Sequence, residues 1–359
     1  MTKVYNFSAG PAILPHDVLV EAQAELLDYA GTGISILESS HRSPEYIAIH
    51  DEAVANLSEL MGITDDYAVL FVQGGASQQF AQVPMNLLPS GQSADYTNSG
   101  SWAKKAIAEA KRLGSVNVIA DTNDTRPTCV PDPDSLEITP DAAYVHVTSN
   151  ETISGAQWKR FPECDAPLVA DMSSDILSRA IDVTPFGLIF AGAQKNLGPS
   201  GLTVVVVRKD LAEAAPENIP AIFRYQTQID AGSMYNTPPC FGVYLFMLVT
   251  RWLKGLGGVA AVENMNDEKA GRLYAAIDGT DFYRGAAAVE HRSAMNVTFN
   301  LPDEALEKRF AAESADVGLK GLKGHRSVGG LRASIYNAFP AEGVDALVAF
   351  MADFEKQNG

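Results

Sequence analysis

The residue best placed to do chemistry is Lys195, which lies in the segment Ala191-Gly-Ala-Gln-Lys-Asn-Leu-Gly-Pro-Ser-Gly201. Apolar runs over 188–191 and 202–207 flank it, and both are short and bounded by glycines, which predicts two buried strands. Burial makes a charged lysine costly and lowers its pKa, so that the amine becomes a nucleophile. An ordinary lysine in a turn reaches solvent, but these small residues and paired strands favour a lysine that forms a Schiff base.

A carboxylate precedes this lysine at a suitable distance along the chain. Asp171 ends the apolar run Leu168-Val-Ala-Asp171, and one connection and one further strand separate it from Lys195. Enzymes that use pyridoxal phosphate need a carboxylate against the pyridine nitrogen, which keeps the ring protonated. Acids at strand ends also cap helices and start turns. The order and spacing of the pair nevertheless predict a pyridoxal phosphate site.

Further segments share one order and spacing with a known family. They are Asn6-Phe-Ser-Ala-Gly-Pro-Ala12, Ser40-His-Arg42, Gly74-Gly-Ala-Ser77, Asn150-Glu-Thr-Ile-Ser-Gly155, Ala170-Asp-Met-Ser-Ser174 and Ala191-Gly-Ala-Gln-Lys195. Together they resemble the phosphoserine aminotransferases, which are class V, fold-type I enzymes dependent on pyridoxal phosphate. The resemblance runs from about residue 5 to the C-terminus.

Alternating strand and helix patterns must position these residues. Helices are expected over 16–30, 44–61, 78–88 and 102–113, and strands over 68–72, 93–98, 116–120, 143–148 and 168–171. This alternation predicts an α/β fold with a mainly parallel sheet, whose ligands bind at the carboxyl ends of the strands. In the first helix, Val18, Leu19, Ala22, Leu26 and Leu27 share one apolar face.

The resemblance implies two domains. We expect a large domain that binds pyridoxal phosphate over 16–260 and a small C-terminal α/β domain over 261–359, with the N-terminal segment 1–15 packing on the small domain. A helical stretch over 242–276, interrupted near 255–258, leads from one to the other.

Several residues are expected to hold the cofactor. The Gly74–Ser77 loop follows a strand and opens a helix, where backbone amides bind phosphate, although such a loop is often only a structural turn. The resemblance implies that Ala76, Ser77 and Gln194 contact the cofactor phosphate and that Trp102 stacks on the ring. It implies that Thr152 bonds the ring hydroxyl and that Ser173 assists. Asn236 and Thr237 would reach the cofactor of a partner subunit, which implies a homodimer with shared active sites.

Basic residues stand out because the chain is acidic. Arg332 lies in an apolar strand pattern, and an arginine suits bidentate binding of a carboxylate or a phosphate. The resemblance implies that Arg332 binds the α-carboxylate of the substrate. It also implies that His41, Arg42, His325 and Arg326 surround the substrate phosphate or the γ-carboxylate of glutamate.

Composition excludes several function classes. The net charge of −17 offers no basic stripe, so we expect no nucleic-acid partner. Three dispersed cysteines favour a reducing cytoplasm, and six scattered histidines lack metal-ligand spacing, so no metal is expected. Neither a signal peptide nor an apolar run long enough for a membrane span is evident, so no membrane association is expected.

The resemblance implies transamination between glutamate and 3-phosphohydroxypyruvate, giving phosphoserine and 2-oxoglutarate, and the related formation of 4-phosphohydroxythreonine for pyridoxine biosynthesis. Two alternatives stay open. A cysteine desulfurase of class V would need a catalytic cysteine on a mobile loop, for which Cys129 is the candidate. A non-catalytic module that binds pyridoxal phosphate would usually lack the lysine.

Overall fold

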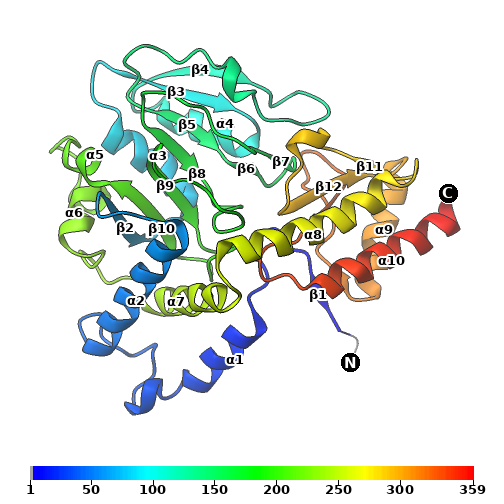
Figure 1. The fold of residues 1–359 in the computed structure, drawn as a ribbon, viewed down its shortest axis with the longest axis horizontal. Coiled ribbons are helices and arrows are strands. Elements are labelled where there is room, and N and C mark those ends of the chain that lie inside the picture. Colours follow the sequence, from blue (N-terminus) through cyan, green and yellow to red (C-terminus); the bar gives the residue numbers. More distant parts are fainter. Residues whose placement is uncertain (1–2) are drawn as a thin grey trace.

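A seven-stranded sheet forms the centre of the larger part of the molecule (Figure 1), in a computed structural model that describes residues 3–359. The strand order is β2-β10-β9-β8-β5-β3-β4. Only β10 runs antiparallel to its neighbours in this sheet. The strands are β2 (Tyr67–Val72), β3 (Ser93–Asn98), β4 (Ser115–Asp121), β5 (Val145–Thr148), β8 (Leu168–Asp171), β9 (Phe186–Gly192) and β10 (Thr203–Arg208).

Side chains alternate between the two faces of the sheet and so enter two different cores. Ile189 and Ala191 of β9 pack into a core shared with helices α2 and α7, whereas Leu188 and Phe190 pack into a core shared with α3 and α4. The helices of this part are α1 (His16–Glu25), α2 (Pro44–Met61), α3 (Gly75–Leu87), α4 (Ser101–Ala110), α5 (Lys209–Glu213), α6 (Tyr225–Asp230) and α7 (Cys240–Gly255). The hairpin β6 (Asn150–Glu151) and β7 (Ala156–Gln157) follows β5.

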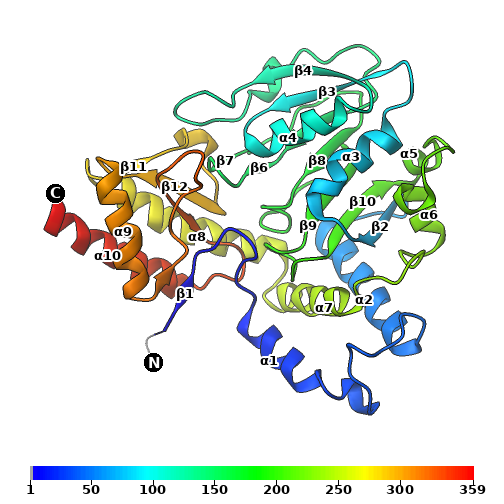
Figure 2. The ribbon, with the colours of Figure 1, turned by 180° about the vertical axis from the view of Figure 1, so that it is seen from behind.

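The C-terminal part contains a second, smaller sheet of order β11-β12-β14. Its elements are α8 (Val259–Asp278), β11 (Arg284–Gly285), β12 (Asn296–Asn300), α9 (Glu304–Asp316), β13 (Leu319–Lys320), β14 (Leu331–Ser334) and α10 (Ala341–Asn358). The N-terminal strand β1 (Tyr5–Asn6) pairs with β13, and Phe7 is fully buried in the same core. Figure 2 shows the chain running from β1 between the two parts of the molecule to α1.

Most predicted elements agree closely with the structure, but the first helix differs. It ends at Glu25 rather than at residue 30, and only Val18 and Ala22 of its expected apolar face are buried within α1. Leu19 is 45% exposed and Leu27 is 84% exposed. The predicted length was wrong because residues 26–28 leave the helix. The predicted apolar face was only partly right, because the rest of the described chain packs against Val18 and Ala22 but leaves Leu19 exposed.

Lys195 lies in the tight connection between β9 and β10, which explains the antiparallel strand. A connection of this length can join antiparallel neighbours, whereas a parallel pair would need a crossover of a dozen residues or more.

Among the helices of residues 3–359, none is by itself long and apolar enough to span a membrane; only α7 and α8 together meet that test, and they are bent by 83° at their break.

Candidate active site

Strands β5 and β8, the turn after β9 and the start of α3 meet around a cavity of about 220 Å³. This is the carboxyl edge of the parallel strands, where such sheets bind ligands. The lining includes the predicted residues Ala76, Ser77, Trp102, Thr152, Asp171, Ser173, Gln194 and Lys195, together with Gly10, Gly75, Thr148, Asn150 and Ser174. The structure therefore brings together most of the residues expected to hold a cofactor.

The turn that carries Lys195 is closed by its own backbone. The carbonyl of Ala193 accepts hydrogen bonds from the N–H groups of Leu197 at 3.1 Å and Gly198 at 2.9 Å. Lys195 Nζ points into the cavity and donates to Thr152 Oγ1 at 2.7 Å. The side chain keeps some exposure towards the cavity, yet desolvation lowers the pKa of Lys195 to about 8, partly opposed by Asp171. The neutral, nucleophilic form of the amine is therefore far more populated near neutral pH than for an exposed lysine.

The N-terminal segment covers the lysine. A Cβ atom on Gly10 would lie 3.6 Å from Lys195 Cγ, and Ala12 N–H donates to the carbonyl of Gln194 at 2.8 Å. This close approach uses a glycine whose φ is +152°, a conformation that other residues rarely adopt. Gly10 thus forms part of the wall of the site, and the bond from Ala12 holds the segment against the turn of Lys195.

Asp171 lies at the end of β8 with a buried carboxylate. Ser173 N–H donates to Asp171 Oδ1 at 2.9 Å, and Ser173 Oγ accepts from Gly192 N–H at 3.0 Å. Burial raises the pKa of Asp171, while the bonds from Ser173 and the charge of Lys195 oppose this. A cationic group beside the carboxylate would lower this pKa and hold it ionised.

Unpartnered polar atoms surround these two charged residues. Trp102 Nε1, Thr148 Oγ1 and Asn150 Oδ1 are buried without a hydrogen-bond partner in the described part of the chain. Buried polar atoms are normally paired, so these atoms indicate a polar ligand. The ring of Trp102 has its centroid 5.7 Å from Lys195 Nζ. An aromatic ring that carries an aldehyde, a basic nitrogen and a phosphate fits this donor set.

The start of α3 supplies the anion-binding end of the cavity. Gly74 and Gly75 have φ values of +90° and +66°, and they turn the chain from β2 into the helix. Ala76 and Ser77 follow in the first turn, where backbone N–H groups lack helical partners and attract anions.

Other predicted residues do not line this cavity. His41 and Arg42 lie in the turn before α2, and His325 and Arg326 lie in the loop before β14. Asn236 and Thr237 follow α6, where Asn236 Nδ2 donates to Gln73 Oε1 at 3.4 Å. Within one chain these residues therefore stay outside the space that Lys195 and Asp171 face.

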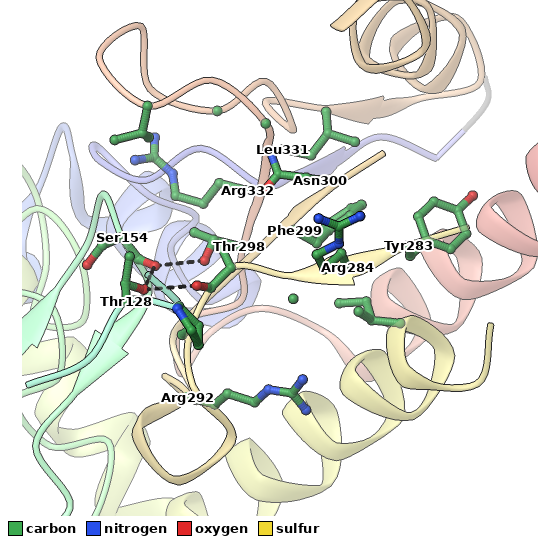
Figure 3. A pocket seen from close by; sticks show the side chains of 18 of the residues that line it. Thr128, Ser154, Tyr283, Arg284, Arg292, Thr298, Phe299, Asn300, Leu331 and Arg332 are labelled. Carbon is green, nitrogen blue, oxygen red and sulfur yellow. Dashed lines mark hydrogen bonds between the residues drawn. The ribbon is translucent and has the colours of Figure 1, made fainter. Parts of the chain in front are cut away.

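Arg332 connects the site to a second, larger cavity of about 890 Å³ (Figure 3). Its Nη1 donates to the carbonyl of Thr152 at 3.2 Å, which places its guanidinium beside the residue that binds Lys195. Arg284 and Arg126 also line the larger cavity, as does Arg292, which is paired with Asp278. Four arginines thus line the larger cavity in a chain whose net charge is negative.

Three lining residues, Gly10, Thr148 and Ser174, were not among the residues expected at the site. Thr148 ends a predicted strand at the same sheet edge as Asp171, so its position was a usable signal. Ser174 lies within a segment already noted, and its hydroxyl accepts from Asn150 Nδ2 at 2.8 Å. Gly10 had no local signal, because its contact with Lys195 joins distant parts of the chain. Among residues 3–359, no group of three or more His, Cys, Asp or Glu side chains is arranged to hold a metal ion.

The whole chain is similar to known proteins in sequence and in fold. Residues 4–347 match the model of the family described as aminotransferase class-V. The chain is 54% identical to the phosphoserine aminotransferase of Desulfatibacillum aliphaticivorans, over 99% of each chain.

Two solved structures extend the comparison. The phosphoserine aminotransferase from Bacillus circulans subsp. alkalophilus is 52% identical, with a TM-score of 0.98 and 100% of each chain covered. The pyridoxal phosphate-bound enzyme from Trichomonas vaginalis is 40% identical, with a TM-score of 0.94, covering 98% of this chain and 100% of that one. With matches that span the whole length of its relatives, the chain belongs to the class V aminotransferases and, among them, to the phosphoserine aminotransferase family.

Proposed function

We propose that the protein transfers the amino group of glutamate to 3-phosphohydroxypyruvate, giving phosphoserine and 2-oxoglutarate, with pyridoxal phosphate as its cofactor. The observation that carries this proposal is the pairing of Lys195 and Asp171 in one polar cavity beside Arg332. The bound cofactor supplies a protonated pyridine ring that withdraws electrons from the substrate's α-carbon.

The residues of the chain divide the remaining work. Lys195 Nζ would hold the cofactor aldehyde at rest and, once freed, would act as the general base and acid that moves the proton of the substrate's α-carbon. Asp171 would keep the ring nitrogen protonated, and Thr152 would donate to the ring hydroxyl. Trp102 would cover one face of the ring.

The phosphate end is held by the start of α3. The N–H groups of Ala76 and Ser77, together with Gln194, would bind the cofactor phosphate there. Ser173 supports the loop of Asp171 through its bond with Gly192.

The direct test uses the purified protein with pyridoxal phosphate. Glutamate should bleach the visible band of the bound cofactor, and 3-phosphohydroxypyruvate should restore it with release of phosphoserine. Initial rates should follow ping-pong kinetics, because one substrate leaves before the next binds. Bleaching by cysteine with release of sulfide, but not by glutamate, would contradict the proposal.

The described cysteines give no support to a desulfurase. Cys129, Cys164 and Cys240 do not line the cavity of Lys195, and burial raises the pKa of all three thiols. A desulfurase needs a thiolate that reaches the substrate. A non-catalytic module is disfavoured because Lys195 and Asp171 are both present and face one cavity.

We propose that the enzyme is a homodimer with shared active sites. Large apolar side chains are exposed along α1 and the segment after it, namely Leu19, Val20, Leu27, Ile34 and Leu37. Exposed apolar surface of this kind marks an interaction site. Asn236, Thr237, His41 and Arg42 lie outside the cavity of their own chain, which is the position expected of residues that serve a partner's site.

Mixing two inactive variants tests this arrangement. Lys195→Ala chains combined with chains carrying Asn236→Ala and Thr237→Ala should regain activity, because each mixed dimer has one site with both sets of residues intact. Random pairing of equal amounts should restore about a quarter of the wild-type sites. Activity is measured after subunit exchange in dilute denaturant, with each variant alone as the control. Full activity of wild-type monomers in sedimentation would contradict the proposal.

We propose that His41, Arg42, His325 and Arg326 bind the substrate phosphate and the γ-carboxylate of glutamate, whereas Arg332 binds the α-carboxylate. Gly74–Ser77 has no basic side chain, so that loop serves the cofactor alone. Burial lowers the pKa of His325, and the nearby charges of Arg332, Arg326 and Lys105 lower it further. These groups form a positive cluster beside the approach to the site.

Substitution of the arginines should separate the two roles. Arg42→Ala and Arg326→Ala should lower kcat/KM for phosphoserine by about 10- to 150-fold, the effect of losing a charge-assisted hydrogen bond of about 1.5–3 kcal/mol. Serine, which has no phosphate, should be affected much less. Arg332→Ala should lower kcat/KM for phosphoserine, glutamate and serine alike. Equal losses on all three substrates in the Arg42 and Arg326 variants would show that the two sites are exchanged.

Three further assignments remain proposals. We propose a large domain over 16–260 and a small domain over 261–359, with the segment 1–15 packed on the small domain. Separate hydrophobic cores in the two parts and the pairing of β1 with β13 support this division.

We propose a cytoplasmic location, supported by three free cysteines. Use of 3-hydroxy-2-oxo-4-phosphooxybutanoate, to form 4-phosphohydroxythreonine, is proposed because that substrate carries the same phosphate and 2-oxo acid groups.

A further inference from the structure

Helix α4 is capped by a residue from a distant part of the chain. Its N-cap is Gly100, which has no side chain to accept hydrogen bonds. The carboxylate of Glu151 takes that place, accepting from Ala103 N–H at 3.1 Å and from Trp102 N–H at 3.3 Å. Ser99 Oγ donates to the same carboxylate at 3.4 Å. A negative charge at a helix N-terminus also interacts favourably with the helix dipole.

The fit between Glu151 and the helix is close. Glu151 is fully buried, and a Cβ atom on Gly100 would lie 2.5 Å from Glu151 Cδ. A side chain at position 100 would therefore displace the glutamate carboxylate from the helix N-terminus. Burial of this carboxylate raises the pKa of Glu151 to about 7, against the effect of the two backbone N–H groups. The arrangement keeps a costly buried acid in place, next to Asn150 and Thr152 of the cavity wall.

Glu151 does not line the cavity itself, but Trp102 does. The indole Nε1 of Trp102 has no hydrogen-bond partner in residues 3–359, so no hydrogen bond of the ring fixes its position; the ring packs on the core of α3 and α4, with Lys105 Nζ 4.2 Å from its centroid. The backbone of Trp102, in contrast, is bound directly by Glu151 Oε2. The position of the ring relative to the cavity therefore depends in part on how the first turn of α4 is held.

We propose that Glu151 is a positioning residue, which holds Trp102 against the cofactor ring by capping α4 from the neighbouring hairpin. The inference rests on the proposed contact between Trp102 and the cofactor. It assigns a role to a buried acid that touches neither the substrate nor the cofactor, and it explains why residue 100 is a glycine.

A double-mutant cycle on cofactor affinity tests the inference. Apoenzyme is titrated with pyridoxal phosphate for the wild type, Glu151→Gln, Trp102→Ala and the double variant. Glutamine has the size of glutamate but presents an NH₂ group to one of the helix N–H donors, so the first turn of α4 should shift and the Trp102 ring should lose its place; affinity should fall about 10-fold, the order of effect of losing one aromatic stacking contact. In the Trp102→Ala background the same change should have almost no effect.

A matched control and a rescue complete the design. Glu109→Gln makes the same chemical change on the same helix, away from its N-terminus, and should leave both the affinity and the absorption maximum of the bound cofactor unchanged. Glu151→Ala should lose affinity, and adding Gly100→Ser should recover most of it. The serine supplies a local cap, and residue 100 has an extended backbone that serine adopts readily.

Two results would overturn the inference in distinguishable ways. Equal losses from Glu151→Gln in the presence and absence of the Trp102 ring would show that Glu151 supports the fold without positioning Trp102. Unchanged affinity in Trp102→Ala would remove the proposed ring contact and the inference with it, while leaving the proposed reaction intact.

Discussion

Lys195→Ala is expected to lower kcat by at least about 10³-fold, since it removes both the covalent anchor of the cofactor and the group that moves the α-proton, and general acid–base catalysis alone contributes about 10²- to 10⁴-fold. The fold should survive, because the Nζ of Lys195 makes one hydrogen bond, to Thr152, and carries a desolvated charge that alanine would remove. Single turnovers with glutamate, compared with the wild type, measure the effect.

The position of the covalent bond can be measured independently of activity. Borohydride reduction of the wild-type enzyme, followed by peptide mapping, should place the cofactor on Lys195. Lys105→Ala is the matched control, because its Nζ lies 4.2 Å from the Trp102 ring centroid but outside the cavity of Lys195. Since the pKa of Lys195 is lowered to about 8, reconstitution of apoenzyme should accelerate as pH rises through 8 and level off above it. Label on another lysine would disprove the assignment.

The sequence predicted the centre of this site well because its signals are local. Asp171 ends a buried apolar run and Lys195 lies between two others, and the structure contains strands at β8, β9 and β10 in those places. Which residues of a helix or a strand share one face depends only on their spacing along the chain. Local patterns of this kind also predicted the bounds of α2 and β3 correctly.

Contacts between distant segments could not be predicted in this way. The approach of Gly10 to Lys195, the bond from Arg332 to the carbonyl of Thr152 and the capping of α4 by Glu151 each join segments far apart in the chain. The exposed leucines Leu19 and Leu27 illustrate the same limit. Their apolar pattern was clear from the sequence, but their burial depends on which distant segments pack against them, and the described chain leaves both exposed.

Asp171→Asn is expected to lower the rate of the half-reaction with glutamate by about 10²- to 10⁴-fold, because an uncompensated buried charge costs about 3–5 kcal/mol. Asparagine keeps the size of the side chain and an oxygen that can accept the bond from Ser173 N–H, so the fold should be preserved. It lacks the charge that holds the ring nitrogen protonated, so electron withdrawal from the α-carbon should weaken. Stopped-flow absorbance at saturating glutamate measures this step alone.

Asp175→Asn provides a matched control, because Asp175 is equally buried but does not line the cavity. Its carboxylate accepts from Ser149 Oγ and from Gln157 Nε2, so its replacement should lower the free energy of unfolding by about 1–3 kcal/mol. The half-reaction rate of this variant should stay within a few-fold of the wild type. Two buried aspartates a few residues apart would then separate cleanly, one by its effect on rate and one by its effect on stability. A near-normal half-reaction rate in Asp171→Asn would contradict the role of Asp171 as counter-ion. Asp171 would then resemble Asp175, whose replacement is expected to affect stability and not rate.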